Sequence, residues 1–322
     1  MPRVPELSRA VREALDAGRP VVALESTIIS HGLPRPGNLG AARSFEALLA
    51  GSGVTPATIA VIDGVPKAGL SDAELERIAL DASVIKVSSR DLGLAMAAKR
   101  TAGTTVAATS VLAARAGIRV FATGGLGGVH RGFAETPDES ADLGVLSRTP
   151  VTVVSAGVKS ILDIPATLER LETLGVAVAG YRTNRFPAFY LTDSGQDLDW
   201  RLDSPAEVAA VMAARDALGD TSALLVANPL AADKQLDPAV HDRALDGALR
   251  AAESAGVRGK AVTPYLLAHM QRVTEGASVA VNLDVARGNI ALAAQVALAW
   301  AVLRKRGNLS RTAATIRRGR SG

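Results

Sequence analysis

Short apolar runs rich in β-branched residues alternate along the chain with segments whose apolar residues recur at helical spacing. A short apolar run bounded by turn residues is typical of a strand buried on both faces. Such runs occupy Val21–Leu24, Ala57–Asp63, Val84–Val87, Arg119–Thr123, Val151–Val154, Val176–Gly180 and Ala223–Asn228. Helical patterns fall between and after them, at Leu7–Ala17, Gly40–Leu49, Thr104–Ala116, Pro165–Leu174, Thr263–Met270 and Asn289–Leu303. This alternation predicts an α/β fold in which a mostly parallel, mixed sheet is covered by helices on both faces.

Helix starts and the absence of linkers indicate the domain organisation. Ser71–Glu74 and Ser204–Glu207 are capping boxes, in which serine and glutamate side chains satisfy free backbone donors. The acidic segment Asp138–Asp142 is expected to open another helix. Since no Gly/Ser-rich linker or internal repeat divides the chain, residues 1–303 are expected to form a single three-layer α/β/α domain. Residues 304–322 are basic and are expected to form a flexible, solvated tail.

Composition narrows the possible partners and locations. With 48% hydrophobic and 21% charged residues, the 322-residue chain can bury a large core. No apolar run reaches the roughly 18 to 20 residues of a membrane span, and the amino terminus lacks the apolar core of a signal peptide. The absence of cysteine excludes disulfides and thiolate chemistry, so a cytoplasmic location is expected. Aromatic residues make up only 3%, which argues against a nucleic-acid partner because bases would have no stacking platform.

The segment Val151–Pro165 places a lysine where α/β proteins usually bind ligands. A β-branched run ends shortly before Gly157, which permits a sharp turn, so Lys159 is expected at the carboxyl end of a strand. Only seven of the 36 basic residues are lysines, so a lysine in apolar surroundings calls for an explanation. Burial of this kind lowers the pKa of an amine and leaves part of it as a free nucleophile. The alternative is an ordinary lysine at a helix start with its ammonium group in water.

Other polar residues lie at or near the ends of neighbouring strands. Glu25 could be a general acid that burial keeps protonated, or a structural cap on the Pro-rich loop that follows it. Lys86 lies on the third short strand. The glycine cluster Gly124–Gly132 matches dinucleotide-binding motifs only loosely, and could either bring backbone donors to an anion or form a tight turn. An amine, an ammonium group and a carboxylic acid are what an imine-forming enzyme acting on a phosphorylated sugar would need.

Evidence for a metal site is limited. Asp138 and Asp142 lie four residues apart, on one face if the segment is helical, and could hold a hard cation through oxygen. The helix dipole explains carboxylates in a first helical turn equally well. His31 and His130 have no partner at metal-ligand spacing and are interpreted as polar loop residues. Gly-x-Ser-x-Gly and His-Glu-x-x-His motifs do not occur, so serine-hydrolase and zincin chemistry lack support.

Six strings in a fixed order connect these segments to a known family. They are Ala23–Pro34, Lys86–Leu92, Gly103–Thr109, Gly124–Gly132, Asp138–Leu143 and Ser155–Asp163. With them, the chain resembles the pseudouridine-5'-phosphate glycosidase family, also called indigoidine synthase A-like proteins, over roughly residues 20–299. The resemblance implies that Lys159 forms an imine with ribose C1 and that Glu25 protonates the departing uracil carbon.

The resemblance also implies how substrate and metal are held. Lys86, near the phosphate, and the turn at Val106 would hold the substrate. Asp138 would carry one manganese ion, largely through water. Further substrate contacts are implied at Ser140, Ala141, Asp142 and Asn282. Glu139 stands where the family pattern has an apolar residue, which affects cation affinity rather than the reaction. A homotrimer is implied as well.

The implied activity is reversible cleavage of pseudouridine 5'-phosphate to uracil and ribose 5-phosphate, in pseudouridine degradation. A C-glycosidic bond has no leaving heteroatom to protonate, so an imine at C1 would supply the electron sink that lets carbon leave. A lysine-dependent sugar-phosphate lyase or aldolase would use the same amine on another substrate. A catalytically silent nucleotide-binding module would instead hold phosphate through the glycine loop and Lys86, with Lys159 an ordinary surface residue.

Overall fold

The computed structural model describes residues 5–135, 137–258 and 261–318, with residues 307–318 as backbone only. The strands are β1 (Glu6–Leu7), β2 (Val21–Leu24), β3 (Thr55–Ile62), β4 (Val65–Ala68), β5 (Ile85–Val87), β6 (Ala102–Thr104), β7 (Val120–Ala122), β8 (Thr152–Ser155), β9 (Ala177–Tyr181), β10 (Arg201–Leu202) and β11 (Leu224–Ala227). The α-helices are α1 (Arg9–Asp16), α2 (Gly37–Gly51), α3 (Asp72–Leu80), α4 (Leu92–Ala97), α5 (Val106–Ala116), α6 (Ala141–Leu146), α7 (Ile164–Thr173), α8 (Pro205–Leu218), α9 (Pro238–Ser254), α10 (Val262–Val273) and α11 (Ala277–Arg318). Three short helical segments are η1 (Ile28–Gly32), η2 (Ser89–Asp91) and η3 (Ala232–Lys234).

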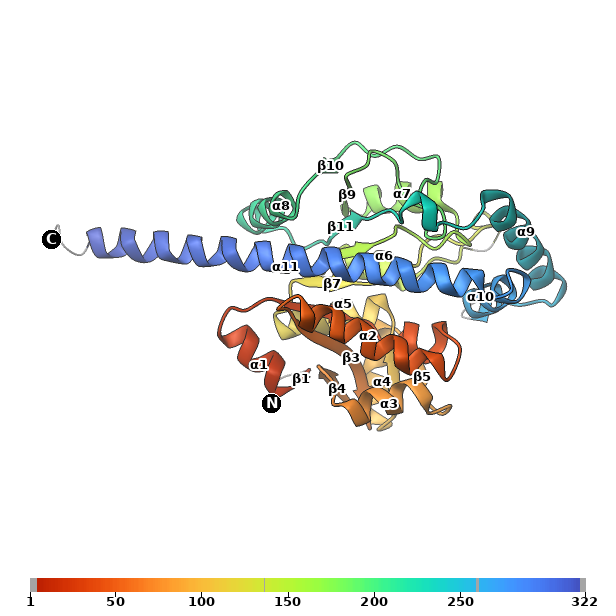
Figure 1. Ribbon diagram of the computed structural model, residues 1–322, viewed down its shortest axis with the longest axis horizontal. Coiled ribbons are helices and arrows are strands. Elements are labelled where there is room, and N and C mark those ends of the chain that lie inside the picture. The colour runs from red at the N-terminus through yellow and green to blue at the C-terminus, as the bar shows by residue number, and fades with distance from the viewer. Residues whose placement is uncertain (1–4, 136, 259–260, 319–322) are drawn as a thin grey trace.

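An 11-stranded mixed sheet forms the centre of the molecule (Figure 1). Its main path runs β1-β4-β3-β2-β7-β8-β11-β9-β10, and β5 and β6 branch from β3. Among the described strands, the antiparallel pairings are those of β3 with β4 and of β3 with β6, so the sheet is mostly parallel. The expected α/β fold with a mixed, mostly parallel sheet is therefore confirmed.

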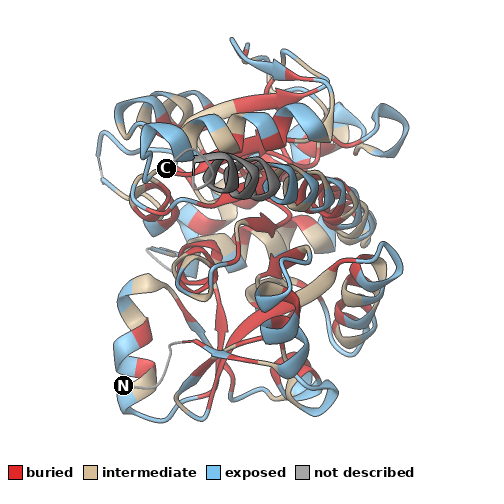
Figure 2. Ribbon diagram, turned by 90° about the vertical axis from the view of Figure 1, so that its left-hand side faces the viewer, coloured by how far each residue is buried: buried red, intermediate tan, exposed pale blue. Residues whose placement is uncertain are grey.

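Side chains of the central strands alternate between two cores, one on each face of the sheet. Val21 and Ala23 of β2 belong to the core shared with α5, α6 and α7, whereas Val22 and Leu24 belong to the core shared with α2, α8 and α11. In β7, Phe121 belongs to the first of these cores, whereas its neighbours Val120 and Ala122 belong to the second. Because helices cover both faces, every position of these strands is buried, which explains their continuous apolar runs (Figure 2). The expected three layers are thus present.

The structure confirms the strands predicted from apolar runs and adds four short ones that the runs do not predict. β4 contains Pro66 and Lys67, and β6 consists of Ala-Gly-Thr, so neither has an apolar signal. β1 and β10 have two residues each. Helix α7 begins at Ile164, one residue before the expected start at Pro165, and residues 160–163 connect it to Lys159.

Helix α11 is longer than the sequence pattern predicts. The expected end at Leu303 is wrong, because α11 continues through the basic segment to Arg318 and projects beyond the rest of the fold (Figure 1). The flexibility expected of residues 304–322 stays a prediction.

By length and composition alone, the part of α11 from Ala277 to Arg306 could cross a membrane, which corrects the expectation that no apolar segment is long enough. Half of its most apolar window is buried inside the protein, and it packs against β2, β7, β8, α2 and α8, as a core helix does.

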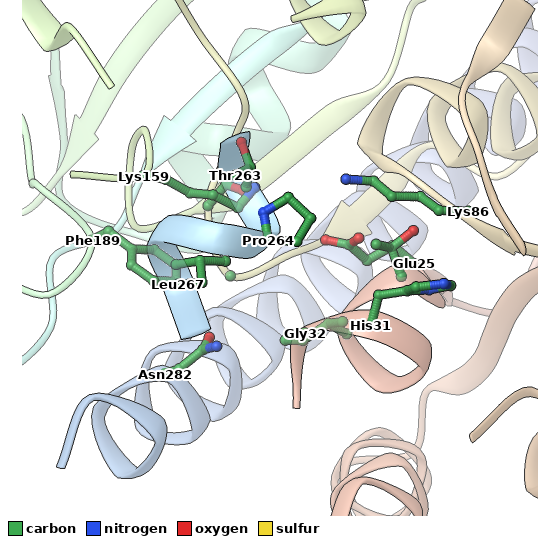
Figure 3. Close-up of a pocket in the computed structure, with 14 residues that line it drawn as sticks. Glu25, His31, Gly32, Lys86, Lys159, Phe189, Thr263, Pro264, Leu267 and Asn282 are labelled. Carbon is green, nitrogen blue, oxygen red and sulfur yellow. The ribbon is translucent and has the colours of Figure 1, made fainter. Parts of the chain in front are cut away.

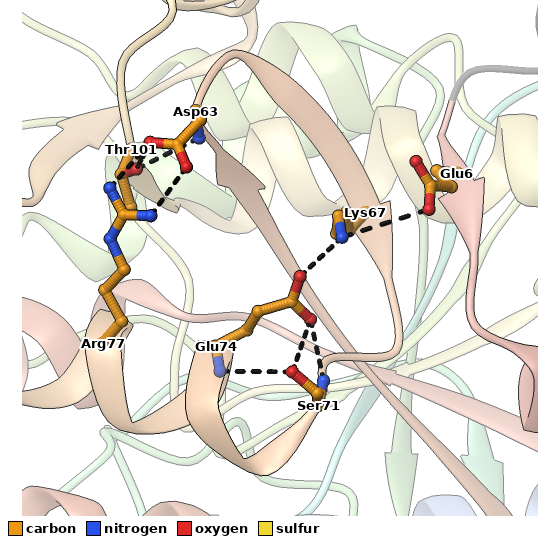
Figure 4. A network of polar contacts seen from close by, with 7 residues as sticks. All are labelled: Glu6, Asp63, Lys67, Ser71, Glu74, Arg77 and Thr101. Carbon is orange, nitrogen blue, oxygen red and sulfur yellow. Dashed lines mark hydrogen bonds and ion pairs between the residues drawn. The ribbon is translucent and has the colours of Figure 1, made fainter.

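The capping box predicted at Ser71 is present and connects α3 to the β3–β4 hairpin (Figure 4). The Ser71 hydroxyl accepts a hydrogen bond from the Glu74 N–H, and the Glu74 carboxylate accepts bonds from Ser71 and from Lys67 of β4. Burial alone would raise the pKa of Glu74, but these hydrogen bonds outweigh it and lower that pKa below its ordinary value. At the second predicted box, Ser204 accepts from the Glu207 N–H, whereas the Glu207 carboxylate accepts from the N–H of Asp203.

Replacing Ser71 with alanine should lower the free energy of unfolding by about 0.5–2 kcal/mol, because backbone donors at the start of α3 lose their acceptor. Chemical denaturation at neutral pH measures this change. Ser44, inside α2, provides the matched control, and Ser44→Ala should leave the free energy of unfolding nearly unchanged. Equal losses in the two variants would contradict the role of the cap.

Candidate active site

Three neighbouring parallel strands deliver polar side chains to one edge of the sheet. β2 pairs with β7, and β7 pairs with β8. Glu25 directly follows β2, Thr123 directly follows β7, and Lys159 lies in the turn after β8. Because the carboxyl ends of parallel strands meet at the same edge, these residues gather there. The expected position of Lys159 beyond a strand end is confirmed.

A pocket enclosing about 570 Å³, part of it open to solvent, lies at this edge. Figure 3 shows Lys159 and Lys86 entering it from opposite sides, with Glu25 and His31 on the side of Lys86. Asn282 reaches it from α11. The full lining consists of Glu25, Thr27, Ile28, His31, Gly32, Lys86, Gly124, Gly125, Lys159, Phe189, Thr263, Pro264, Leu267 and Asn282. Four of the nine site residues expected from the sequence, Glu25, Lys86, Lys159 and Asn282, therefore share one pocket.

Glu25 has the environment of a proton donor. Burial raises the pKa of its carboxyl group above the ordinary value, and the Asp142 carboxylate adds to that effect. Lys159, the hydrogen bond from the Thr123 hydroxyl and Lys86 act in the opposite direction, but burial outweighs them. Among the described residues, the Glu25 side chain is hydrogen-bonded to Thr123, at the end of the adjacent strand, and not to the Pro-rich loop. This favours the general acid over the structural cap.

Lys159 is half-buried and directed into the pocket. Its Nζ donates a 2.8 Å hydrogen bond to the carbonyl oxygen of Gly125. The turn that presents it depends on Gly157, which has φ +73° and whose missing Cβ would lie 2.3 Å from the carbonyl oxygen of Pro187. The alternative of a lysine head in bulk water does not describe this geometry. The partly uncharged amine expected from the sequence stays a prediction.

Lys86 extends from β5 and differs from Lys159 in its surroundings. Burial of its amino group lowers the pKa of Lys86, and the nearby Lys159 ammonium lowers it further, while Glu25 and Asp142 oppose the shift. Its side chain as a whole is nevertheless exposed to solvent, so the effect of burial on this pKa is partial. An anionic group of a ligand could therefore replace water at this ammonium group and reduce the repulsion between the two lysines.

Asp142 is buried, and its carboxylate holds together two segments that lie behind the lining residues. Its two carboxylate oxygens accept hydrogen bonds from the N–H groups of Ala107, at 2.9 Å, and Gly127, at 2.8 Å. The carboxylate thus joins the start of α5 to the glycine cluster. Val106, the first residue of α5, is buried beside this contact. Neither Asp142 nor Val106 lines the pocket, although the charge of Asp142 acts on Glu25 and Lys86.

Asp138, Ser140 and Ala141 also lie outside the pocket lining. The expectation that Asp138 and Asp142 share a helix face is wrong, because Ser140 caps α6, which begins at Ala141. The Ser140 hydroxyl accepts a 3.2 Å bond from the Asp142 N–H. A serine side chain that accepts a hydrogen bond from a free backbone N–H in this way marks the start of a helix. Asp138 therefore lies before α6 and not in it.

The described side chains around Asp138 could offer a metal ion one carboxylate ligand, but not a complete set of protein ligands. Burial lowers the pKa of His130, and the nearby Asp138 carboxylate opposes that shift. Glu139, next to Asp138 in the chain, accepts hydrogen bonds from Nε and Nη2 of the Arg170 guanidinium group at 2.9 and 3.0 Å. Across residues 5–135, 137–258 and 261–318, no group of three or more histidine or acidic side chains gathers to hold an ion.

The glycine cluster is a close-packed turn in this structure. A Cβ on Gly127 would lie 2.2 Å from the Ser140 hydroxyl, and one on Gly125 would lie 2.6 Å from the Phe189 ring. The Gly127 N–H already bonds Asp142, and the Gly125 carbonyl accepts from Lys159. The tight-turn interpretation is therefore favoured over a set of free anion-binding donors.

Several lining residues were not predicted from the sequence. Thr27 is one of them, and its Oγ1, like Oδ1 of the predicted residue Asn282, is buried at the pocket without a hydrogen-bond partner among the described residues. Buried polar atoms are seldom left without a partner, so these two are candidates to bond a ligand. Thr263, Pro264 and Leu267 come from α10, more distant in sequence than any local pattern can connect. His31 also lines the pocket, and burial lowers its pKa, with Lys86 and Arg35 adding to the effect.

Comparisons with known proteins agree over nearly the whole chain. The family model "Indigoidine synthase A like protein" matches residues 10–299. A pseudouridine-5'-phosphate glycosidase of Frankia alni is 62% identical over 295 residues, covering 92% of this chain and 82% of the relative. One from Streptomyces griseus is 59% identical over 298 residues and covers 92% of each chain.

Solved structures share the fold at lower identity. The prealnumycin C-glycosynthase AlnA, in complex with ribulose 5-phosphate, has a TM-score of 0.86 and 35% identity, covering 94% of this chain and 98% of that one. An indigoidine synthase A-like protein from Thermotoga maritima has a TM-score of 0.84 and 34% identity, covering 92% and 96%. Because the family model and both curated relatives extend over most of its length, this chain belongs to the indigoidine synthase A-like family, as its six sequence strings indicate.

Proposed function

We propose that this chain is a pseudouridine-5'-phosphate glycosidase, which cleaves its substrate reversibly to uracil and ribose 5-phosphate in pseudouridine degradation. The observation that carries the proposal is the meeting of two lysines and one carboxyl group of raised pKa in a single pocket. The names of curated relatives at 59–62% identity support the choice of substrate.

Lys159 is the nucleophile in the proposed reaction. When the ribose ring opens, the amine bonds to C1, and the ring oxygen leaves that carbon and takes up a proton to become a hydroxyl group. The hydrogen bond from Nζ to the Gly125 carbonyl holds the amine in one place before the attack. Such positioning removes part of the entropic barrier to bond formation.

Glu25 is the acid that completes carbon–carbon cleavage. As the bond between C1 and uracil breaks, the nitrogen lone pair forms the C=N bond of an iminium, and the bonding electron pair stays on the uracil carbon. Glu25 supplies the proton to that carbon, and its raised pKa favours the protonated form that a donor needs. Water then adds to C1 and releases ribose 5-phosphate, returning the amine of Lys159. Each step can run in reverse.

The two ends of the substrate would meet different parts of the pocket. Lys86 would bind the phosphate, whose negative charge offsets the repulsion between the two lysines. Asn282 Oδ1 and Thr27 Oγ1, both unpaired in the described structure, would bond polar groups of the base or the opened sugar. The positions expected for Val106, Ser140, Ala141 and Asp142 remain proposals, with Asp142 acting through the glycine segment and through its charge.

A manganese ion fits this chain as a largely water-coordinated ion. Asp138 would hold it through its carboxylate, because Glu139 is engaged by Arg170. When bound, such an ion would supply positive charge for the substrate phosphate. The homotrimer, the cytoplasmic location and the absence of membrane or nucleic-acid partners likewise remain predictions.

Synthesis of C-glycosides is a second candidate function. AlnA, 35% identical, is named a C-glycosynthase and was crystallised with a pentulose phosphate. The same imine, run in the direction of bond formation, would serve that activity. Supplying ribose 5-phosphate with uracil and with other carbon nucleophiles, and comparing product formation, separates the two functions.

Replacing Lys159 with alanine should reduce uracil release from pseudouridine 5'-phosphate by roughly a thousandfold or more, because the covalent route is lost. Lys86→Ala should mainly raise the KM, since that side chain binds rather than reacts. An ultraviolet assay of free uracil measures both variants. If Lys159→Ala kept full activity, the silent nucleotide-binding module would be the better explanation.

Glu25→Gln should lower kcat by about 10²–10⁴-fold, the range for a lost general acid. In the parent enzyme, activity should fall as the pH rises through the raised pKa of Glu25, because the carboxyl group then loses its proton. The matched control is Glu46→Gln. Burial also raises the pKa of Glu46, but that residue bonds Thr58 and does not line the pocket. Similar kcat losses in both variants would refute the assignment.

Asn282→Ala should raise the KM for pseudouridine 5'-phosphate by roughly tenfold, the value of one lost hydrogen bond at the upper end of its usual range. Steady-state kinetics tests this, with Gln295→Ala as control, since Gln295 is an exposed residue on the same helix. An unchanged KM in Asn282→Ala would show that the unpaired oxygen does not face the substrate.

A further inference from the structure

A buried hydrogen bond ties the residue next to Lys159 to a distant helix. Ser160 is 3% exposed, and its Oγ lies 2.8 Å from Nε2 of His241 on α9, which is 4% exposed. The two residues are 81 positions apart in the chain. Neither side chain lines the pocket, and the proposed reaction has no step for them.

The neighbouring carboxylate sets the direction of this bond. His241 Nδ1 lies 3.0 Å from Asp242 Oδ1. A carboxylate oxygen accepts hydrogen bonds, so the ring nitrogen that faces it is the donor, and the tautomer with its N–H at Nδ1 leaves Nε2 as an acceptor. The Ser160 hydroxyl therefore donates to His241. Removing the acceptor would leave a buried hydroxyl group unpaired.

Helix α9 is connected to the wall of the pocket. It packs against α10, with the Tyr265 hydroxyl 3.4 Å from the carbonyl oxygen of Ala251, and the pair lies at one end of the molecule (Figure 1). Thr263, Pro264 and Leu267 of α10 line the pocket. The imidazole of His241 also lies beside the Tyr190 ring, next to the lining residue Phe189, with 6.3 Å between ring centroids.

Two backbone hydrogen bonds also hold the turn that contains Lys159, and both are made with the glycine cluster Gly124–Gly132. The Lys159 N–H donates to the carbonyl of Leu126 at 3.1 Å, and the Asp163 N–H donates to that of Val129 at 2.9 Å. These bonds hold the turn to the glycine segment. The bond to His241 holds it to the α9–α10 pair, so the nucleophile is fixed between two separate parts of the pocket wall.

We propose that His241 is a positioning residue, which through Ser160 couples the placement of Lys159 to the α9–α10 pair. The inference rests on the proposed imine chemistry. A displacement of about 1 Å at a reacting group can reduce a rate by about 10²-fold. Loss of this bond should therefore slow imine formation while leaving the binding of a non-reacting ligand intact.

The test compares His241→Phe, which keeps a ring but removes the acceptor, with His241→Gln, whose amide oxygen can still accept. The rate of borohydride-trapped adduct with ribose 5-phosphate reports imine formation. The dissociation constant of ribitol 5-phosphate, which has no carbonyl group, reports binding alone. Ser160→Ala and the double variant complete a mutant cycle, and His269→Gln on α10 is the control.

We expect trapping to slow by about 10- to 100-fold in His241→Phe and Ser160→Ala, with no further loss in the double variant. His241→Gln should recover most of the rate, and the ribitol 5-phosphate affinity should stay within about twofold throughout. Trapping at the parent rate in both single variants would overturn the inference, as would additive losses or a parallel loss of affinity. Absence of trapping in the parent protein would instead refute the proposed function itself.

Discussion

The parallel pairing of β2, β7 and β8 is the constraint on which the candidate site depends. Adjacent strands lie about 4.8 Å apart, so residues that follow their carboxyl ends are within hydrogen-bonding reach of one another. This is how the Thr123 hydroxyl meets the Glu25 carboxyl group and how Lys159 comes to act on its pKa. If the register of β2 against β7 shifted, Glu25 would move away from Thr123 and Lys159, although the amino-acid sequence would be the same.

The elements that cover this edge bury the side chains gathered there and so shift their pKa values. Residues of η1, α10 and α11 surround the pocket, and burial is the largest influence on the pKa of both Glu25 and Lys86. Burial favours the neutral form of each group, which helps the Glu25 carboxyl group to keep its proton, whereas a bound phosphate would favour the charged form of Lys86. Bracing by Asp142 and by the bond between Ser160 and His241 holds the pocket wall in place around these groups.

Much of the central sheet could be predicted because strands buried on both faces are unbroken apolar runs. That pattern places Glu25 and Lys159 at strand ends, since a glycine turn after an apolar run is a local signal. The short strand β6 could not be predicted, because Ala-Gly-Thr gains its strand geometry from pairing with β3 and β5. The four-residue spacing of Asp138 and Asp142 predicts one shared face only if the segment is helical, and spacing alone does not reveal that Ser140 is the cap. The contributions of α10 and His241 depend on tertiary packing, and Asn282 was reached through family resemblance alone.

The central claim is that Lys159, and not Lys86, forms the covalent bond to the sugar. The most direct test is to reduce the protein with borohydride during turnover of pseudouridine 5'-phosphate, digest it and locate the added mass by peptide mass spectrometry. We expect a reduced ribose 5-phosphate adduct on the peptide that contains Lys159. An adduct on Lys86, or turnover with no adduct on either lysine, would contradict it.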